Sequence, residues 1–149
     1  IAVDYKHPKI AKQKAHYDFS EASFEEALAE ARTFGFAHEV EMMRKIGLAR
    51  GGSLDNAIVL DETKVLNPEG LRSDDEFVRH KALDCVGDLF LSGYRIKGHV
   101  KTVKPGHLLN TSMAKKLLQQ PQKWREVEAT DSTLPSYQPA ISAEEIAFA

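Results

Sequence analysis

The sequence SDDEFVRHKALDCVGDLFLSG, residues 73–93, predicts the longest helix of the chain. Ser73 and Glu76 have the S-x-x-E spacing of a capping box, and Gly93 is a typical residue at which a helix ends. Apolar residues between them recur on one side of a helix, at Val78, Ala82, Cys85, Val86 and Leu89. We therefore predict a helix from about Asp75 to Ser92 that packs this stripe against a hydrophobic core.

Strand and helix signals are mixed on both sides of this helix. Before it we expect a strand pair at Ile1–Val3 and Ala15–Phe19, a helix from the Ser23-x-x-Glu26 capping box to Gly35, a short helix at His38–Ile46, and strands at Ala57–Leu60 and Val65–Leu66. After it we expect a strand at Tyr94–Val100, a helix capped by Asn110 and ended by Pro121, and a strand at Trp124–Ala129. Because there is no regular βαβ rhythm, the predicted fold class is α+β, a two-layer sandwich in which a mixed β-sheet packs against helices.

Length and composition predict one soluble domain over residues 1–149. A chain of 149 residues, 42% hydrophobic and 28% charged, is long enough for a core but short of two full domains. With 20 Lys and Arg against 22 Asp and Glu, the net charge of −2 favours neither a nucleic-acid partner nor a polybasic membrane anchor. No apolar run is long enough for a transmembrane segment. The single cysteine, Cys85, fits a reducing compartment, and the first residue, Ile1, leads us to expect a segment of a longer protein.

Four polar residues of the predicted helix follow one another at steps of four, namely Glu76, His80, Asp84 and Asp88. Such side chains form one slowly drifting stripe, so His80 and Asp84 are neighbours that can direct a ring nitrogen and a carboxylate to one point. An imidazole and a carboxylate suit zinc among other metals. The same pair is also common on solvated helix faces, where it forms a weak ion pair. A catalytic zinc normally has three protein ligands, so a third ligand would have to come from elsewhere.

A loop histidine provides a second possible chemical group. His107 lies in the sequence Lys104–Pro105–Gly106–His107, just before Asn110. A carboxylate that holds such a histidine fixes its tautomer and raises its affinity for a proton, and Asp88 extends the polar stripe toward this role. The sequence leaves open whether Asp88 and His107 touch, and a turn histidine without special use is the alternative.

Several motifs occur in a specific order along the chain. They are ARTFGF at Ala31–Phe36, GGS at Gly51–Ser53 with NAIV at Asn56–Val59, VLN at Val65–Asn67 with EGLR at Glu69–Arg72, DEFVRHK at Asp75–Lys81 with LD at Leu83–Asp84 and GDL at Gly87–Leu89, and finally Lys104, Gly106–His107 and Asn110. Together they resemble the carboxy-terminal domain of the zinc-dependent UDP-3-O-acyl-N-acetylglucosamine deacetylases of lipid A biosynthesis. The resemblance extends from the first strand to about Val127.

The resemblance implies a role for each matching residue. His80 and Asp84 match two of the family's three zinc ligands. His107 matches a histidine that acts as general acid or electrostatic stabiliser, Asp88 the carboxylate that orients it, and Thr33 a residue that stabilises the oxyanion. The resemblance also implies that Phe34, Lys81, Lys104 and Gly52 contact the substrate. Of these, the cationic Lys104 suits the UDP diphosphate. Gly52 lies in the segment Gly47–Leu66, which corresponds to a small inserted β-α-β-like unit that lines an acyl-chain passage.

The same resemblance implies the reaction and the parts that are missing from this chain. The reaction is zinc-dependent hydrolysis of the N-acetyl amide of the UDP-sugar, with release of acetate, in the cytoplasm of a Gram-negative bacterium. In the family an amino-terminal domain supplies the third ligand, a histidine, and a glutamate that acts as general base. No segment here resembles that domain, so we expect this chain to be inactive alone. The alternative is a non-catalytic module with the same fold that binds the UDP-sugar or its acyl chain.

Overall fold

The computed structural model describes residues 1–18 and 24–128, and over these it is an α+β protein, as predicted. The elements in chain order are β1 (Ala2–Asp4), β2 (Lys12–Lys14), the π-helical turn η1 (Glu25–Ala29), β3 (Thr33–Phe36), α1 (Ala37–Lys45), β4 (Ala57–Leu60), α2 (Glu76–Phe90), α3 (His107–Leu118) and the 3-10 turn η2 (Pro121–Lys123). None of the helices in the described ranges is long and apolar enough to cross a bilayer.

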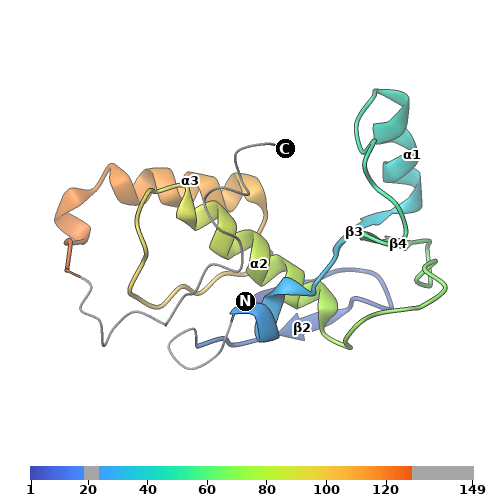
Figure 1. Cartoon of the computed structure of the whole chain (residues 1–149), viewed down its shortest axis with the longest axis horizontal. Helices are drawn as coiled ribbons and strands as arrows, with labels where there is room; N and C mark the ends of the chain where they lie inside the picture. The colour runs from blue at the N-terminus through green and yellow to red at the C-terminus, as the bar shows by residue number, and fades with distance from the viewer. Residues whose placement is uncertain (19–23, 129–149) are drawn as a thin grey trace, which may run out of the picture.

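The strands of the described residues form two small sheets. Strands β1 and β2 are antiparallel, with Val3 opposite Gln13, whereas β3 and β4 are parallel, with Phe34 opposite Ile58. Parallel neighbours need a crossover connection, and α1 provides it. The β3-α1-β4 segment is therefore a β-α-β unit, whose helix α1 stands apart from α2 and α3 in Figure 1. A β-α-β unit is therefore present, but it spans Thr33–Leu60. The unit was predicted at Gly47–Leu66, a range in which the structure has one strand, β4, and no helix.

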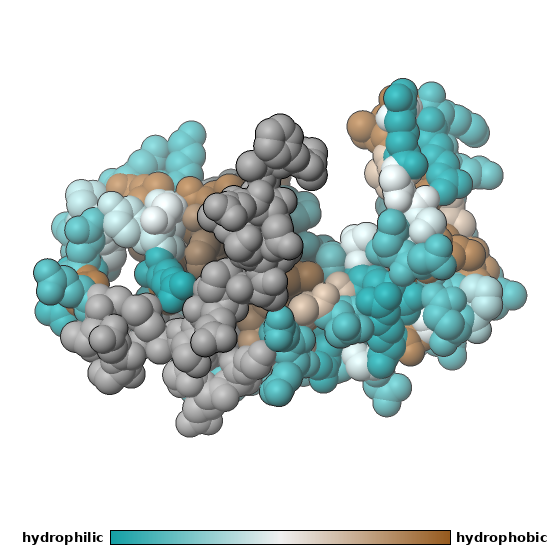
Figure 2. Space-filling view, viewed as in Figure 1, coloured by the Kyte–Doolittle hydropathy of each residue, from teal (hydrophilic) through white to brown (hydrophobic). Residues whose placement is uncertain are grey.

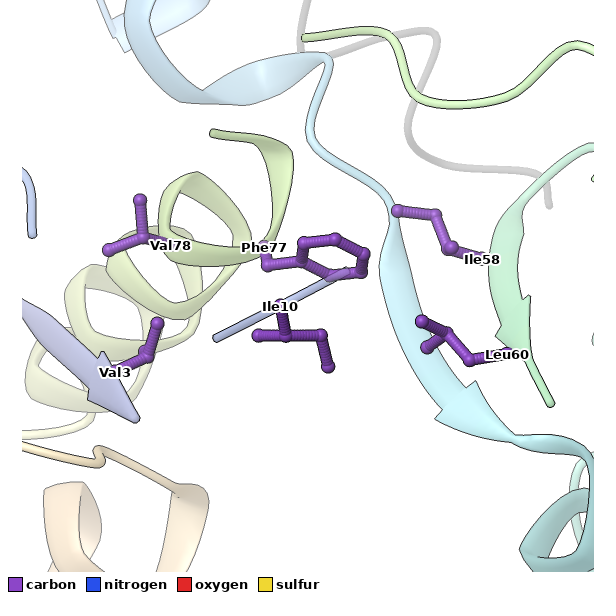
Figure 3. Packing of buried hydrophobic residues seen from close by; sticks show 6 residues of the cluster. All are labelled: Val3, Ile10, Ile58, Leu60, Phe77 and Val78. Atoms are coloured by element: carbon purple, nitrogen blue, oxygen red, sulfur yellow. The ribbon is translucent and has the colours of Figure 1, made fainter. Parts of the chain in front are cut away.

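A single apolar cluster joins both sheets to the first turn of α2. Its buried members are Val3, Ile10, Ile58, Leu60, Phe77 and Val78, all at most 2% exposed (Figure 3). The Phe77 ring lies between α2 and the β3–β4 pair, and it meets the Phe34 ring edge-on at 5.0 Å. Burial of these side chains is the main driving force that places α2 against the sheets.

The long helix forms as predicted, with one error at its start. Of the predicted core stripe, Val78, Ala82 and Cys85 are buried, and Gly93 follows the helix with the positive φ of 80° that favours glycine at this place. The predicted capping box is wrong, because the residue before α2 is Asp75 and no side chain of the described residues caps the helix there. The Glu76 carboxylate instead accepts hydrogen bonds from Arg32 and from the backbone N–H of Arg72.

Several predicted elements differ in the structure. Residues 94–100 are exposed and pair with no strand in the described ranges, so the predicted strand is absent. Residues 124–128 are likewise not a strand, and residue 129 lies outside the described residues, as does Ser23. The strand expected at Ala15–Phe19 forms earlier, at Lys12–Lys14, and Phe19 lies outside the described residues. The first helical segment ends at Ala29, so Gly35 lies inside β3. Asn110 is not a cap either: α3 begins three residues earlier, at His107.

Candidate functional site

His80 lies in the second turn of α2 with its ring orientation fixed by a main-chain contact. Its Nδ1 lies 3.0 Å from the carbonyl oxygen of Ala31, just before β3. Because a carbonyl can only accept, Nδ1 carries the hydrogen. The other ring nitrogen, Nε2, then faces Oδ1 of Asp84 at 3.3 Å, and both side chains are nearly buried, at 12% and 10% exposed. The neighbours predicted by the i, i+4 spacing therefore do meet.

Asp84 is held in its ionised form by two cationic or hydrogen-bonding neighbours. Its second oxygen, Oδ2, accepts a hydrogen bond of 2.8 Å from the Lys81 ammonium, which also lies 5.4 Å from the centre of the Phe34 ring. Burial alone would raise the pKa of the Asp84 carboxyl. The hydrogen bonds and charges of the Lys81 ammonium and of His80 in its doubly protonated form outweigh this effect, so the pKa lies well below its ordinary value. Oδ1 therefore remains a charged oxygen that faces His80.

The separation of these two donor atoms fits a shared metal ion. Two ligands bound to one zinc ion at about 2.0–2.1 Å with a tetrahedral angle lie about 3.3 Å apart. The Nε2–Oδ1 distance between His80 and Asp84 is 3.3 Å. A metal-binding histidine almost always donates its other ring N–H to a carbonyl or carboxylate, as His80 does to Ala31. Over residues 1–18 and 24–128 no group of three or more possible ligands comes together, so this part of the chain offers two donors.

The second histidine of the site comes from α3, which packs along α2 (Figure 1). His107 is the first residue of α3, and its Nδ1 lies 3.0 Å from Oδ2 of Asp88. Nε2 of the same ring lies 4.0 Å from Oδ1 of Asp84, and 72% of the side chain is exposed. The contact that the sequence left open is thus present, and it places an accessible ring nitrogen next to the His80–Asp84 pair.

Thr33 and Phe34 begin β3 beside His80, but they face different surroundings. Thr33 is exposed and lines the same hollow as His80, with a volume of about 370 Å³, together with Asn56 and Arg72. Phe34 is half-buried, and its ring packs edge-on against Tyr5 at 5.6 Å and against Phe77. Thr33 therefore lies at the surface of the hollow beside His80, while the Phe34 ring belongs largely to the packing beneath it.

Two further predicted substrate contacts lie in exposed loops. The carbonyl of Gly52 accepts a hydrogen bond of 3.1 Å from Arg44, in the connection between α1 and β4. Lys104 has a positive φ of 52°, and its backbone N–H donates to Ala2 at 2.7 Å. Within the part of the chain that the structure describes, neither residue has a hydrogen bond or ion pair with His80 or Asp84.

A buried ion-pair network beneath the site was missed by the sequence analysis. The Arg32 side chain, 3% exposed, donates through Nε to Glu76, 1% exposed, at 2.9 Å. It also binds Glu69 and donates to the carbonyl of Gly70 at 2.8 Å. Arg32 is 44 residues from Glu76, so no local spacing could reveal the contact. The DEFVRHK and EGLR motifs contain Glu76 and Glu69, but nothing in either motif indicates a partner for these carboxylates.

Comparisons with known proteins find one family whose sequences are similar to this chain. The family model for UDP-3-O-acyl N-acetylglycosamine deacetylase (LpxC) matches residues 1–119. A UDP-3-O-acyl-N-acetylglucosamine deacetylase of a Nitratiruptor species is 51% identical over 137 residues, which is 92% of this chain and 46% of that protein. A protein of the same name from Aliarcobacter butzleri is 49% identical over 131 residues, 88% of this chain and 44% of the relative. The chain thus spans less than half the length of these curated relatives.

Proposed function

The chain belongs to the UDP-3-O-acyl N-acetylglycosamine deacetylase family, and from this premise we propose that it supplies part of a zinc-dependent deacetylase active site. The substrate would be UDP-3-O-acyl-N-acetylglucosamine, the bond hydrolysed its N-acetyl amide, and the setting lipid A biosynthesis in the cytoplasm of a Gram-negative bacterium. The observation that carries the proposal is the 3.3 Å separation of His80 Nε2 and Asp84 Oδ1. These two atoms would hold the zinc ion.

The residues around this pair have complementary tasks in amide hydrolysis. When bound, zinc supplies Lewis-acid polarisation of the carbonyl and lowers the pKa of water. Asp88 keeps a proton on Nδ1 of His107, so that Nε2 faces the reacting amide; a protonated His107 stabilises developing charge or gives its proton to the leaving amine. The hydroxyl of Thr33, in the hollow beside His80, donates to the oxygen that becomes negative.

The proposed substrate contacts differ in how directly the structure supports them. Lys81 contacts Asp84 and lies over the ring of Phe34. Lys81 and Phe34 would therefore meet the substrate only at the edge of the zinc site. Lys104 is an exposed cation of the loop that leads to His107, a place suited to the diphosphate. Gly52 belongs to the β3-α1-β4 unit, which we propose borders the acyl chain.

We propose that the remaining catalytic groups come from the amino-terminal half of the family's longer proteins. We propose that this half supplies a histidine ligand and a glutamate general base. Two observations support it: the chain covers 46% of a relative 51% identical to it, and α3 carries large exposed apolar side chains directly after His107. They are Leu108 at 83%, Leu109 at 52% and Met113 at 53% exposure, and Figure 2 shows hydrophobic surface over α3. An uncovered apolar face of this kind is typical of an interaction site.

The test measures zinc content and release of acetate from the UDP-sugar, for the chain alone and with the amino-terminal half added. We expect both zinc retention and activity only in the combined sample. Asp84→Ala should abolish both, because it removes one of the two local ligands. The matched control is Asp74→Ala, which removes an exposed carboxylate just before the same helix and should leave both unchanged. Activity of the unmixed chain, or zinc retention by Asp84→Ala, would refute the shared site; a stable fold without either property would favour the binding module.

A further inference from the structure

Asn110 carries a buried amide that contacts the site through a hydrogen bond to Asp88. It lies one turn into α3 and is 3% exposed. Its side-chain Nδ2 donates a hydrogen bond of 2.9 Å to Oδ2 of Asp88. The sequence predicted a helix cap at this position, but the amide points to α2 instead, so its burial requires another explanation.

The Asp88 carboxylate is held from two positions of the same helical turn. His107 Nδ1 lies 3.1 Å from Oδ1 and 3.0 Å from Oδ2, and Asn110 contacts Oδ2. Residues three apart in a helix share a face, so the first turn of α3 presents both donors to one carboxylate. The backbone N–H of Asn110 donates to the carbonyl oxygen of Gly106 at 2.9 Å, which holds the main chain of residue 110 in the first turn of α3. His107, in contrast, is largely exposed and has room to rotate.

We propose that Asn110 is a positioning residue for the deacetylase, an inference that rests on the proposed function. A terminal carboxylate torsion is broad and soft, and a single contact with an exposed ring does not fix it. The Asn110 amide fixes the Asp88 carboxylate in the plane in which it accepts the Nδ1–H of His107. The His107 ring then keeps its hydrogen on Nδ1 and directs Nε2 toward Asp84, the position from which it acts on the amide.

The first test reads the tautomer of His107 by long-range ¹H–¹⁵N NMR of the chain, at a pH well above the ordinary imidazole pKa of about 6.5. Two other histidines are internal references, because His80 donates through Nδ1 to Ala31 and His7 donates through Nε2 to Asp61. We expect the Nδ1–H form of His107 in the wild type and a mixture of both tautomers in Asn110→Ser. The matched control is Thr111→Val, which removes a hydrogen bond to the His107 carbonyl from the same turn and should leave the tautomer unchanged.

The second test separates positioning from simple attachment of α3 to α2. In the protein combined with its amino-terminal half, Asn110→Ser should lower kcat about tenfold to a hundredfold, because Asp88 no longer holds the His107 ring in place. KM should change little. Asn110→Asp places two carboxylates together and should lose both stability and kcat. The exchange Asp88→Asn with Asn110→Asp restores an amide–carboxylate pair, so Tm should recover while kcat should not.

The outcomes are distinguishable from failure of the proposed function. An unchanged His107 tautomer in Asn110→Ser would overturn the positioning role whether or not the protein is a deacetylase. Recovery of kcat together with Tm in the exchanged pair would also overturn it, because the amide would then only join the helices. A shifted tautomer combined with an inactive wild type would instead reject the proposed function.

Discussion

Replacement of Glu76 by alanine tests the buried network that joins β3 to α2. The Glu76 carboxylate accepts four hydrogen bonds: from Arg32 Nε at 2.9 Å, Arg32 Nη2 at 3.2 Å, the Arg32 backbone N–H at 3.1 Å and the Arg72 backbone N–H at 2.6 Å. Glu76→Ala removes all four and leaves a guanidinium that is 3% exposed with Glu69, itself 52% exposed, as its remaining carboxylate. Breaking a buried ion pair on one side costs about 3–5 kcal/mol.

The assay is urea unfolding of the chain, followed by far-ultraviolet circular dichroism and by the fluorescence of Trp124, the single tryptophan. A loss of about 3–5 kcal/mol is a large share of the total stability of about 5–15 kcal/mol that is usual for a domain. The matched control is Glu69→Ala, which removes the half-exposed partner of the same arginine and should destabilise the protein much less than Glu76→Ala, because solvent screens an exposed ion pair.

A double variant separates the charge from the backbone contacts. Arg32→Met with Glu76→Met removes both charges, so it should be more stable than Glu76→Ala. It should not regain wild-type stability, because the backbone N–H groups of Arg32 and Arg72 still lose their acceptor. If Glu76→Ala costs no more than Glu69→Ala, the network does not hold β3 to α2 and the reasoning fails.

Three further predictions concern individual contacts. Gly93→Ala should lower the free energy of unfolding in urea by about 1–2 kcal/mol, because φ is 80° at this residue. Gly87→Ala should raise it by about 0.5–1 kcal/mol, because Gly87 lies inside α2 with open space at its Cβ. Equal effects of the two variants would contradict the role of Gly93 at the end of the helix. Asn67→Ala should lower the free energy of unfolding by about 1–3 kcal/mol, because the Asn67 amide donates to the carbonyls of residues 54 and 57 and accepts from the N–H of residue 59. Hydrogen exchange of the residue 59 amide should become faster in this variant. Burial raises the pKa of Glu76, but the Arg32 and Arg72 hydrogen bonds outweigh it, so the folded-state pKa lies below the ordinary 4.5. The stabilisation is then complete above pH 4.5 and lost as the pH falls through the lower folded value, and Glu76→Gln should unfold with a shallower pH dependence in this window.

The sequence predicted those elements whose signal is local. The signals for α2 are its apolar stripe of Val78, Ala82 and Cys85 and the glycine that follows it, and all of them lie within the helix or next to it. The signal for β4 is a short apolar run. The prediction of a strand at Tyr94–Val100 was wrong because a strand forms only where a neighbouring strand pairs with it. The sequence does not show which strands have an edge that is free to pair.

The site divides in the same way. His80 and Asp84 are one helical turn apart, and the spacing alone brings them together. The contact of Asp88 with His107 spans 19 residues and depends on how α3 packs along α2, so the residues suggested it only as a possibility. Asn110 was misassigned because asparagine is a frequent helix cap, and only the observed start of α3 at His107 turns its amide toward Asp88.

The polar stripe of α2 also shows why periodicity alone does not separate folding from chemistry. Glu76 and His80, one turn apart, hold opposite sides of the same peptide group: the N–H of Arg32 donates to Glu76 at 3.1 Å, and the carbonyl of Ala31 accepts from His80 at 3.0 Å. The first contact belongs to a buried ion pair that stabilises the fold, and the second fixes the ring whose Nε2 faces Asp84. Because one rigid peptide plane carries both contacts, the folding network determines where the proposed zinc ligand points.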